Sequence, residues 1–366
     1  MNIQINREVL IKPLSSVVGI VEKRQALPIL SNLLLIGKDN KLTFTATDLE
    51  MQTSLNIETK IETDFEITIS ARKLFDITRA LPENSILDFQ INESRVNVKA
   101  GKSKFNLQTL PSKDYPLLKK NDSEAVTINL SQKQLKGLLK QVDFAMAQQD
   151  IRYYLNGLLF EIQGQKLNIV GTDGHRLSFT SSKLKESFDK KEVIIPRKTI
   201  MELIKLLEDV NDDVEVQILN QQVTFKFGDI FIITKVIDGK FPDYNRVIPV
   251  GYENGFLIDR QMLLNAMQRA SILSNEKYRG IRLVLSENNM QLITTNSEQE
   301  EAQEDIEIDY KKDAIDIGFN VTYLIDVLNN IQFDQLSFAF KDSNSSCLVT
   351  IPNNEDYKYV VMPMRI

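Results

Sequence analysis

The chain has 366 residues, of which 42% are hydrophobic and 26% charged, a composition that excludes a disordered or fibrous protein. No apolar run approaches the roughly 18 residues that span a bilayer, and the first residues, MNIQINREVL, lack the apolar core of a signal peptide, so we expect a cytoplasmic protein. One cysteine and one histidine, Cys347 and His175, exclude a disulfide framework and leave little for a metal site, so we expect no metal and no cofactor.

Charge is distributed unevenly along the chain. The total of 44 basic and 50 acidic residues gives a net charge of −6, whereas nucleic-acid binding usually appears as a basic excess. Residues 1–120 carry +3, residues 121–250 carry −1 and residues 251–366 carry −8. Chance and solubility explain such a gradient as well as attraction between opposite ends of two chains arranged head to tail.

The predicted elements follow the same order three times along the chain. Each stretch opens with a short strand and continues with a helix in which apolar residues recur at helical spacing, as at Leu135, Leu138, Leu139 and Val142. The strands are predicted at residues 3–5, 126–129 and 255–258, and the helices at 7–22, 131–146 and 260–272.

Individual residues indicate where these helices begin or bend. Ser131 and Asp259 have the side chains of helix N-caps. Pro13 lies inside the first helical pattern, which predicts a later start or a kink there. Alternating strands such as 155–162 and 281–285 come next, and a second helix is predicted in each stretch at 70–81, 196–207 and 320–328.

These patterns are internal repeats. Residues 42–48, 167–173 and 292–296 have the same alternating pattern and end 125 and then 123 residues apart, and Tyr115-Pro116 precedes Phe241-Pro242 by 126. The sequence therefore predicts an α+β fold with antiparallel sheets in three tandem similar domains, with polar junctions at 119–124 and 249–254. The domains are predicted at residues 1–120, 125–250 and 253–366.

Two such chains are large enough to form a ring. A domain of this size has a radius of gyration of roughly 14 Å, and six touching spheres of that kind leave a hole of about one sphere diameter, in which a duplex roughly 20 Å across fits. Two head-to-tail interfaces close such a ring. A linear three-domain monomer has the same repeats, so geometry does not choose between them.

Several motifs resemble the bacterial sliding clamps, the β subunits of DNA polymerase III. The resemblance runs from the first residue to the last and includes the triple repeat. Its motifs are Leu27-Pro-Ile-Leu30, Gln149-Asp-Ile-Arg-Tyr-Tyr-Leu-Asn-Gly157, Thr172-Asp-Gly-His-Arg-Leu177, Phe241-Pro-Asp-Tyr244, Ser274-Asn-Glu-Lys277 and Tyr359-Val-Val-Met-Pro-Met-Arg-Ile366.

The resemblance implies a homodimeric ring of the DNA clamp fold, with two helices per domain lining the hole and the sheets outside. Such a ring encircles duplex or primed DNA without reading sequence and confers processivity on DNA polymerase III. It is not an enzyme. The implied partners are the polymerase III catalytic subunit, the clamp loader complex, and other polymerases and repair proteins that dock short linear peptides.

Three sets of site residues follow from the resemblance. The DNA-binding positions are Arg24, Arg72, Gln149, Tyr153, Tyr154 and Arg197. Gln148 stands where relatives commonly have histidine, which leaves its role in DNA contact open. The hydrophobic cleft for partner peptides comprises Leu155, Thr172, Gly174, His175, Arg176, Leu177, Pro242, Arg246, Val247, Ser346, Val360, Met362, Pro363 and Met364.

The third set forms the interface between the two chains. One side is Lys73, Ile77, Lys102, Lys104, Phe105 and Leu107, and the other is Arg269, Ile272, Leu273, Glu298, Glu300, Glu301 and Glu304. By itself the acidic run at 297–304 is typical of a solvated loop or helix face. Opposite a basic domain, it is suited to a salt-sensitive interface.

An enzyme is the main alternative class of protein, and the sequence lacks the motifs that would support it. The chain has no Gly-x-Ser-x-Gly and no Gly-x-Gly-x-x-Gly motif, and Ala100-Gly-Lys-Ser103 lacks the earlier glycine of a phosphate loop because that position is Val96. A monomeric three-domain scaffold that binds peptides without DNA remains the alternative function.

Overall fold

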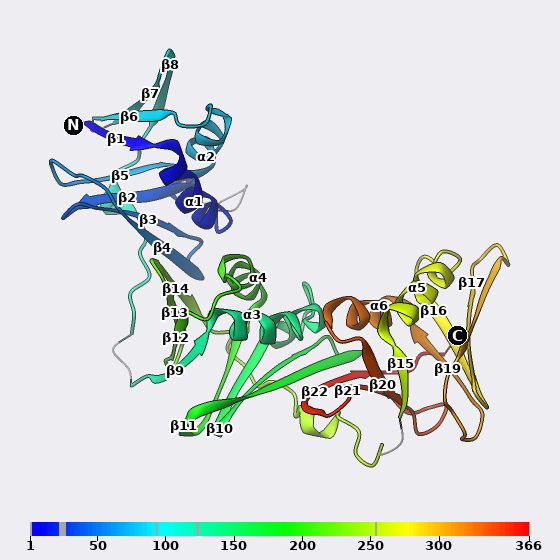
Figure 1. Ribbon diagram of the computed structural model, residues 1–366. Coiled ribbons are helices and arrows are strands. Elements are labelled where there is room, and N and C mark those ends of the chain that lie inside the picture. The colour runs from blue at the N-terminus through cyan, green and yellow to red at the C-terminus, as the bar shows by residue number, and fades with distance from the viewer. Residues whose placement is uncertain (1, 22–26, 93, 122–123, 253–254, 366) are drawn as a thin grey trace. The chain divides into compact units, whose positions relative to one another are not determined.

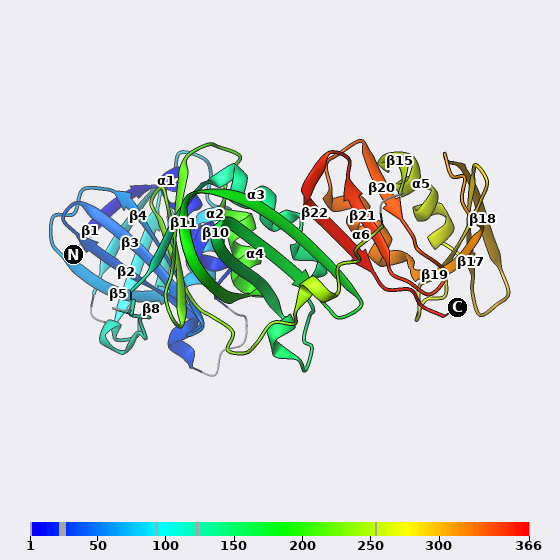
Figure 2. The ribbon, with the colours of Figure 1, turned by 90° about the horizontal axis from the view of Figure 1, so that it is seen from below.

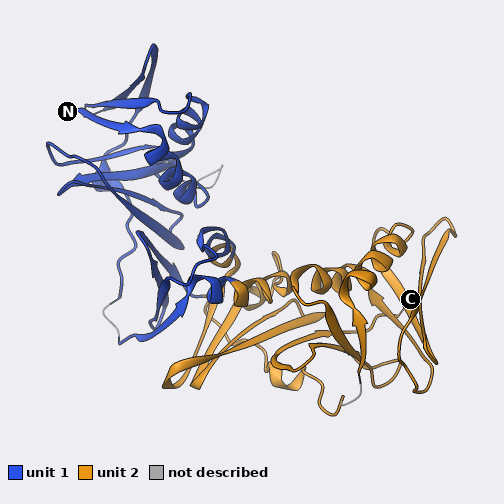
Figure 3. Ribbon diagram, in the orientation of Figure 1, with its two compact units in different colours: residues 1–136, 201–236 blue, residues 137–200, 237–366 orange. Residues whose placement is uncertain are grey.

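The computed structural model describes residues 2–21, 27–92, 94–121, 124–252 and 255–365. The chain divides into two compact units (Figure 3), residues 1–136 with 201–236 and residues 137–200 with 237–366. Among the described residues, the strands form antiparallel sheets of four and eight strands in the first unit and of six and four strands in the second. This confirms the predicted α+β class.

The first unit contains a four-stranded and an eight-stranded sheet (Figure 1). The strand order of the first sheet is β1 (Asn2–Asn6), β6 (Ile86–Ile91), β7 (Arg95–Ala100) and β8 (Ser103–Gln108). The order of the second is β5 (Phe65–Ser70), β2 (Asn32–Lys38), β3 (Lys41–Thr47), β4 (Met51–Glu58), β14 (Ile230–Lys235), β13 (Gln222–Phe227), β12 (Asp213–Ile218) and β9 (Val126–Ser131).

The second unit contains a six-stranded and a four-stranded sheet, and Figure 2 shows β20, β21 and β22 side by side. The order of the larger sheet is β10 (Gly157–Thr172), β11 (Arg176–Pro196), β22 (Asn354–Val361), β21 (Cys347–Ile351), β20 (Gln335–Ala339) and β15 (Phe256–Asp259). The order of the smaller is β18 (Glu301–Glu307), β17 (Asn289–Thr295), β16 (Gly280–Ser286) and β19 (Ile315–Asn320).

The helices occur in the predicted order. In the first unit, α1 (Arg7–Val18) packs on α2 (Ala71–Ala80), and in the second α5 (Arg260–Ser271) packs on α6 (Val321–Asn330). The other helices are α3 (Gln132–Lys140), α4 (Arg197–Leu206) and the short 3-10 turns η1 (Pro28–Ser31), η2 (Ser112–Asp114), η3 (Asp143–Ala145), η4 (Tyr153–Leu155) and η5 (Tyr244–Arg246).

Of three local predictions about the helices, two need correction and one is confirmed. The first helix begins at Arg7 with Pro13 inside it, so the predicted later start is wrong. The helix predicted over 131–146 ends at Lys140, and a 3-10 turn at Asp143–Ala145 follows. The Asp259 side chain accepts a hydrogen bond from the backbone N–H of Met262 (2.7 Å), which confirms the N-cap.

Alternation of apolar and polar residues determines which strand faces reach the core. In β1, Ile3 and Ile5 are buried while the residues between and beside them are exposed. In the second unit, strands of both sheets and the apolar faces of α5 and α6 bury one cluster that includes Phe319, Phe338 and Tyr357. A second cluster around Leu159, Leu177 and other residues underlies the candidate site.

One turn appears in both units with the same hydrogen bonds, in agreement with the internal repeat. The hydroxyl of Thr47 donates to the carbonyl of Met51 (2.8 Å), and that of Thr172 donates to the carbonyl of Arg176 (2.6 Å). The Asp48 carboxylate accepts backbone N–H groups of residues 50 and 51, as Asp173 does for residues 175 and 176. In each unit, the strand after this turn pairs with a strand from later in the chain, β4 with β14 and β11 with β22.

Candidate functional site

A pocket of about 210 Å³ lies in the second unit, beside the turn that links β10 to β11. Its walls come from η4, from the turn, from the segment around η5 and from the end of β22. The lining residues are Arg152, Tyr154, Leu155, Thr172, Gly174, His175, Arg176, Leu177, Phe241, Pro242, Tyr244, Val247, Val360 and Met362.

The pocket floor is apolar because paired strands present their inner faces there. Leu177 of β11 lies opposite Val360 of β22 in the strand register, and both side chains are 1% exposed. Met362 follows β22 and is 43% exposed, and its backbone N–H donates to the carbonyl of His175 (2.9 Å). An apolar trough with a methionine at its rim suits ligands of varied shape.

The turn at the rim is held by its own side chains. The Thr172 hydroxyl accepts the N–H of Gly174 (3.1 Å), and the Asp173 carboxylate accepts the N–H groups of His175 (2.9 Å) and Arg176 (3.0 Å). Gly174 has a φ of +88°, a conformation that residues with a Cβ rarely adopt. The His175 side chain is exposed. The turn therefore presents a fixed backbone edge to the pocket.

Arg176, which the resemblance places in the cleft, lines the pocket with a side chain that is largely committed to partners within the chain. Its side chain is only 10% exposed and forms ion pairs with Asp173 (3.0 Å) and Asp326 (2.5 Å). Its guanidinium also donates to the carbonyl of Phe144 (2.6 Å) and lies 4.4 Å from the centre of the Tyr323 ring. Burial acts to lower the pKa of Arg176, but the nearby Tyr359, Asp326 and Asp173 outweigh it and raise that pKa above its usual range. The residue stabilises the wall of the pocket.

Arg152 is the arginine that the sequence analysis missed. Its guanidinium forms two hydrogen bonds with the Asp150 carboxylate (3.0 and 2.8 Å) and donates to the carbonyl of Asp173 (3.0 Å). The hydrogen bond from the Arg152 side chain lowers the pKa of Asp150 to about 2. A Cβ at Gly174 would lie 2.8 Å from the nearest Arg152 nitrogen, so the glycine gives the arginine its space.

Most of the predicted cleft residues meet in this pocket, while a few do not. Those that line it are Leu155, Thr172, Gly174, His175, Arg176, Leu177, Pro242, Val247, Val360 and Met362. Within the described part of the chain, its lining does not include Arg246, Ser346, Pro363 or Met364. Arg152, Phe241 and Tyr244 also line the pocket although they were not predicted there, and Tyr154, predicted to contact DNA, lines it as well. All four lie within the motifs that carry the resemblance.

The predicted DNA-contact residues differ in exposure. Arg72 on α2 and Gln149 are exposed, and Tyr153 is 58% exposed. Tyr154 is half-buried, and Arg197 at the start of α4 donates to the carbonyls of Asp143 (3.4 Å) and Met146 (3.3 Å). Arg24 lies outside the described residues. Tyr153 and Tyr154 lie in the 3-10 turn η4.

Part of the predicted interface set lies on or directly beside two edge strands, β8 and β18. On the described chain, β8 and β18 each have a strand on only one side. Lys102, Lys104, Glu300 and Glu301 are exposed. The acidic run, expected as a loop or helix face, continues from residue 301 as strand β18, because its residues pair with β17 from Asn289 to Thr295.

The remaining interface positions are mixed in character. Lys73, Glu298 and Ile272 are exposed, and Ile272 is 76% exposed. Ile77, Phe105 and Leu273 are partly buried, and Leu107 is buried. Arg269 and Glu304, predicted on the same side, already form two hydrogen bonds with each other (2.8 and 2.6 Å).

Two groups of buried polar residues lie near the pocket. Tyr244 donates to the Glu161 carboxylate, which also accepts from Asn168 (3.0 Å) and pairs with Lys190 (3.3 Å). Burial raises the pKa of Asp143 to about 6, although the charge of Arg197 opposes that shift. One oxygen of the Asp143 carboxylate has no hydrogen-bond partner.

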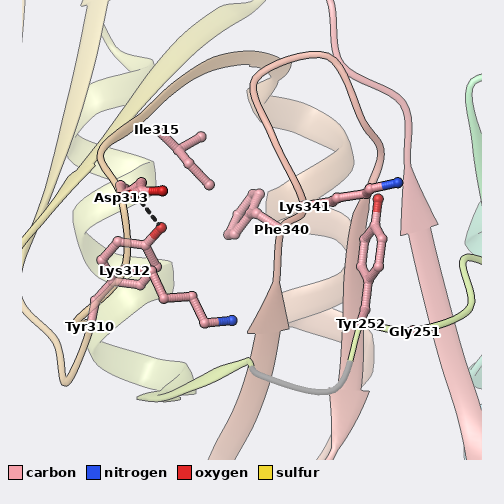
Figure 4. Close-up of a pocket in the computed structure, with 8 residues that line it drawn as sticks. All are labelled: Gly251, Tyr252, Tyr310, Lys312, Asp313, Ile315, Phe340 and Lys341. Carbon is pink, nitrogen blue, oxygen red and sulfur yellow. Dashed lines mark hydrogen bonds between the residues drawn. The ribbon is translucent and has the colours of Figure 1, made fainter.

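A second pocket of about 260 Å³ carries none of the predicted site residues (Figure 4). Phe340 and Ile315 contribute apolar surface, while Lys312, Lys341 and Asp313 bring both signs of charge. The Tyr310 hydroxyl donates to the carbonyl of Asp313 (2.7 Å). In the described ranges no group of three or more histidine, cysteine or acidic side chains is arranged to hold a metal, and no helix has the length and apolarity to cross a membrane.

Comparison with known proteins gives full-length matches. Models of the DNA polymerase III beta subunit match in chain order, with the N-terminal domain at residues 1–119, the central domain at 129–243 and the C-terminal domain at 245–365. The proteins named beta sliding clamp from Pseudomonas putida and Escherichia coli K12 are 45% and 41% identical to this chain, each match covering 100% of both sequences.

Solved structures agree with the sequence matches. The DNA polymerase sliding clamp from Pseudomonas aeruginosa with ligand has a TM-score of 0.95 and 44% identity, with 100% of each chain covered. A sliding clamp from the same organism bound to griselimycin has the same score, identity and coverage.

Proposed function

The chain belongs to the DNA polymerase III beta subunit family, the bacterial sliding clamps, and from this we propose that two copies close into a ring around duplex DNA and hold the replicative polymerase on its template. Its function is that of a sliding clamp, a non-catalytic processivity factor of DNA replication. The observation that carries the proposal is 45% identity over the whole length of a beta sliding clamp.

Enclosure accounts for an acidic protein that works on DNA. A closed ring stays on the duplex by topology, so its retention does not depend on tight binding to phosphates. Strong phosphate contacts would also slow sliding, because each contact must break as the ring moves. A chain of net charge −6 with a few cations near its DNA-facing residues fits this requirement.

Edge strands provide the means of ring closure. An edge strand offers unpaired backbone N–H and C=O groups to another chain, and β8 and β18 are edges on the described chain. We assign β8 with Lys102 and Lys104 to one side of the interface and β18 with Glu300 and Glu301 to the other. Their opposite charges favour head-to-tail pairing between two copies. The Arg269–Glu304 pair orders the acidic side within its own chain.

DNA contact is assigned to polar and aromatic side chains, of which Arg72, Gln149 and Tyr153 are exposed while Arg197 is partly buried. Arg72, Gln149 and Arg197 hydrogen-bond phosphates without reading sequence, and Tyr153 lies against a sugar or an unpaired base. We also assign Arg24, which lies outside the described residues, to DNA contact. Tyr154 belongs to both sites, because it lines the pocket as well as neighbouring Tyr153.

The pocket at the turn between β10 and β11 receives short linear peptides of partner proteins. The apolar floor of Leu177 and Val360 takes hydrophobic side chains, and the flexible Met362 adapts to different partners. Through this pocket the chain binds the catalytic subunit of DNA polymerase III, the clamp loader, and other polymerases and repair proteins. It acts in the cytoplasm.

We retain three domains, residues 1–120, 125–250 and 253–366, as the units of this assembly. The repeated turn at Thr47–Met51 and Thr172–Arg176 supports the division between the first two. A monomeric peptide-binding scaffold without DNA is not favoured, because the full-length relatives are sliding clamps.

A processivity assay tests the role of the pocket. The Met362→Asp variant introduces a charge at the pocket rim, and the control, Leu257→Asp, introduces it on strand β15 at a leucine that is 50% exposed. A strand position serves as the control because helices of this family face the DNA. With polymerase and loader on primed circular DNA, we expect Met362→Asp to shorten the products at least tenfold and Leu257→Asp to leave them unchanged. Full-length products with Met362→Asp would contradict the assignment.

A further inference from the structure

We infer that Arg152 is a positioning residue that links the DNA-contact segment to the peptide pocket, so that a ligand in the pocket strengthens DNA binding. This inference rests on the proposed function of both sites. Its basis is one short segment, residues 149–156, that serves both. Tyr154 and Leu155 line the pocket, while Gln149, Ile151 and Tyr153 are exposed.

The segment is held as a unit by its own polar side chains. The Asn156 side chain accepts the N–H of Asp150 (3.0 Å) and donates to the carbonyl of Asp150 (2.9 Å), which closes the loop at its base. The Asp150 carboxylate accepts the Arg152 N–H (2.8 Å) and both sides of its guanidinium fork. A charge-assisted pair of this geometry fixes orientation as well as distance.

Arg152 joins this loop to the opposite wall of the pocket. The same guanidinium that binds Asp150 donates to the carbonyl of Asp173, in the turn that forms the pocket rim. Gly174 at φ +88° leaves no side chain between that turn and the arginine. Arg152 itself lines the pocket, so a bound ligand touches the group that holds the two walls together.

Contact between Tyr153 and Tyr154 extends this link from the pocket to the exposed face of residues 149–156. Their ring centres are 5.9 Å apart in an edge-to-face arrangement, and both rings lie over Gly239, whose absent side chain leaves them space. Tyr154 packs on the cluster under the pocket. A ligand that holds Tyr154 and Arg152 therefore also holds Tyr153, the residue assigned to DNA.

This arrangement predicts positive linkage. The backbone of residues 149–156 is already held in the free chain, but the Tyr153 side chain is 58% exposed and loses rotamer freedom when it contacts DNA. A pocket ligand that fixes Tyr154 and Arg152 restricts Tyr153 beforehand, so the second ligand binds at a lower entropic cost. Linkage of this kind is reciprocal, so DNA strengthens pocket binding by the same factor.

Two cross-titrations test the inference on the full-length chain. The probes are griselimycin, which a Pseudomonas aeruginosa relative binds, and a short labelled duplex with a single-stranded overhang. We expect the duplex to bind at least about fivefold more tightly with saturating griselimycin, and griselimycin to bind more tightly by the same factor with saturating duplex. Loss of griselimycin binding in Met362→Asp locates the probe in the pocket.

The variants separate positioning from simple structural damage. In Arg152→Ala and Arg152→Lys, which cannot form the two-pronged pair with Asp150, we expect the linkage to fall to less than twofold. The linkage is the ratio of duplex affinities with and without saturating griselimycin, so it is measured whatever affinity each variant keeps for either probe alone. The matched control is Arg95→Ala, an exposed arginine on β7, and it should keep the full linkage. The melting temperatures report folding of each variant.

The outcomes are distinct. Equal or weaker duplex binding with griselimycin present, or linkage that survives in Arg152→Ala, overturns the inference and leaves the proposed function intact. Failure of the native chain to bind the duplex at all contradicts the proposed function, and this inference falls with it.

Discussion

At the residue scale, the buried carboxylate of Glu161 depends on its donors. Glu161 is only 6% exposed, and its carboxylate accepts hydrogen bonds from Tyr244 and Asn168 and forms an ion pair with Lys190. These hydrogen bonds hold its pKa below the usual range although burial acts in the opposite direction. The same contacts join the segment around η5 to β10, which positions one wall of the pocket.

Removal of one donor should destabilise this wall. Tyr244→Phe leaves the Glu161 carboxylate without its phenol partner. We expect a loss of about 1–3 kcal/mol in unfolding free energy, measured by denaturant unfolding of the full-length chain. Tyr153→Phe, at a phenol that is 58% exposed, should change stability by less than about 0.5 kcal/mol. Equal stability of both variants would contradict the role of the network.

Asp143 gives a pH-dependent prediction. Burial raises its pKa in the folded chain to about 6 from an ordinary 3.8. The folded chain therefore holds this proton more tightly than the unfolded chain, so the penalty is absent below about pH 4 and fully present above about pH 6. Asp143→Asn removes the charge. We expect the unfolding free energy of this variant to match the native one near pH 4 and to exceed it at pH 7 by about 3 kcal/mol, with a melting temperature that is equal at pH 4 and higher at pH 7. A difference that stays constant with pH would contradict this.

Arg152 and Arg176 show which features of the pocket could be predicted from the sequence motifs and which could not. The Thr172–Leu177 and Gln149–Gly157 motifs located the pocket, and both arginines lie in them. Their roles were not predictable, because Arg176 is buried by Asp326 and Tyr323, which lie about 150 positions later in the chain. Arg152 is turned toward the pocket by Asp150, two residues away.

At the element scale, β18 has a structure that its composition conceals. Its sequence, EAQEDIE, has one large apolar residue, Ile306, so the strand alternation is weak and the run was expected as a loop or helix face. Pairing with β17, whose alternate residues Met290 and Leu292 are buried, makes it a strand. The strands with clear alternation, such as β1 and β12, were predictable.

The charge on this edge should control association. Glu300→Lys with Glu301→Lys reverses the charge of the β18 edge that we assign to a partner bearing Lys102 and Lys104. We expect the dimer dissociation constant to rise at least tenfold at low salt and less at high salt, because exposed charges are screened, measured by sedimentation.

The matched control places the same charge change on another strand. Glu355→Lys with Asp356→Lys alters two exposed residues of β22 and should leave the dimer unchanged. An unaltered dimer in the β18 variant at nanomolar concentration would count against the assignment of this edge.

At the scale of the whole molecule, three repeats in the sequence become two compact units in the structure. The middle repeat is divided, because β14 pairs with β4 in the first unit and β11 pairs with β22 in the second. Repeats can be recognised from spacing alone, since Asp48 and Asp173 occupy the same turn 125 positions apart. Pairing of strands from different repeats involves backbone groups, which carry no signature in the side-chain pattern.

Retention by enclosure of the duplex can be distinguished from retention by tight binding, because an enclosing ring slides off a free DNA end. The chain is loaded with its clamp loader onto a nicked circular duplex, freed of loader, and separated from unbound protein by gel filtration before and after a single cut in the circle. We expect the protein to stay with the circle and to be released when the cut provides an end. Retention on the linear duplex equal to that on the circle would contradict enclosure.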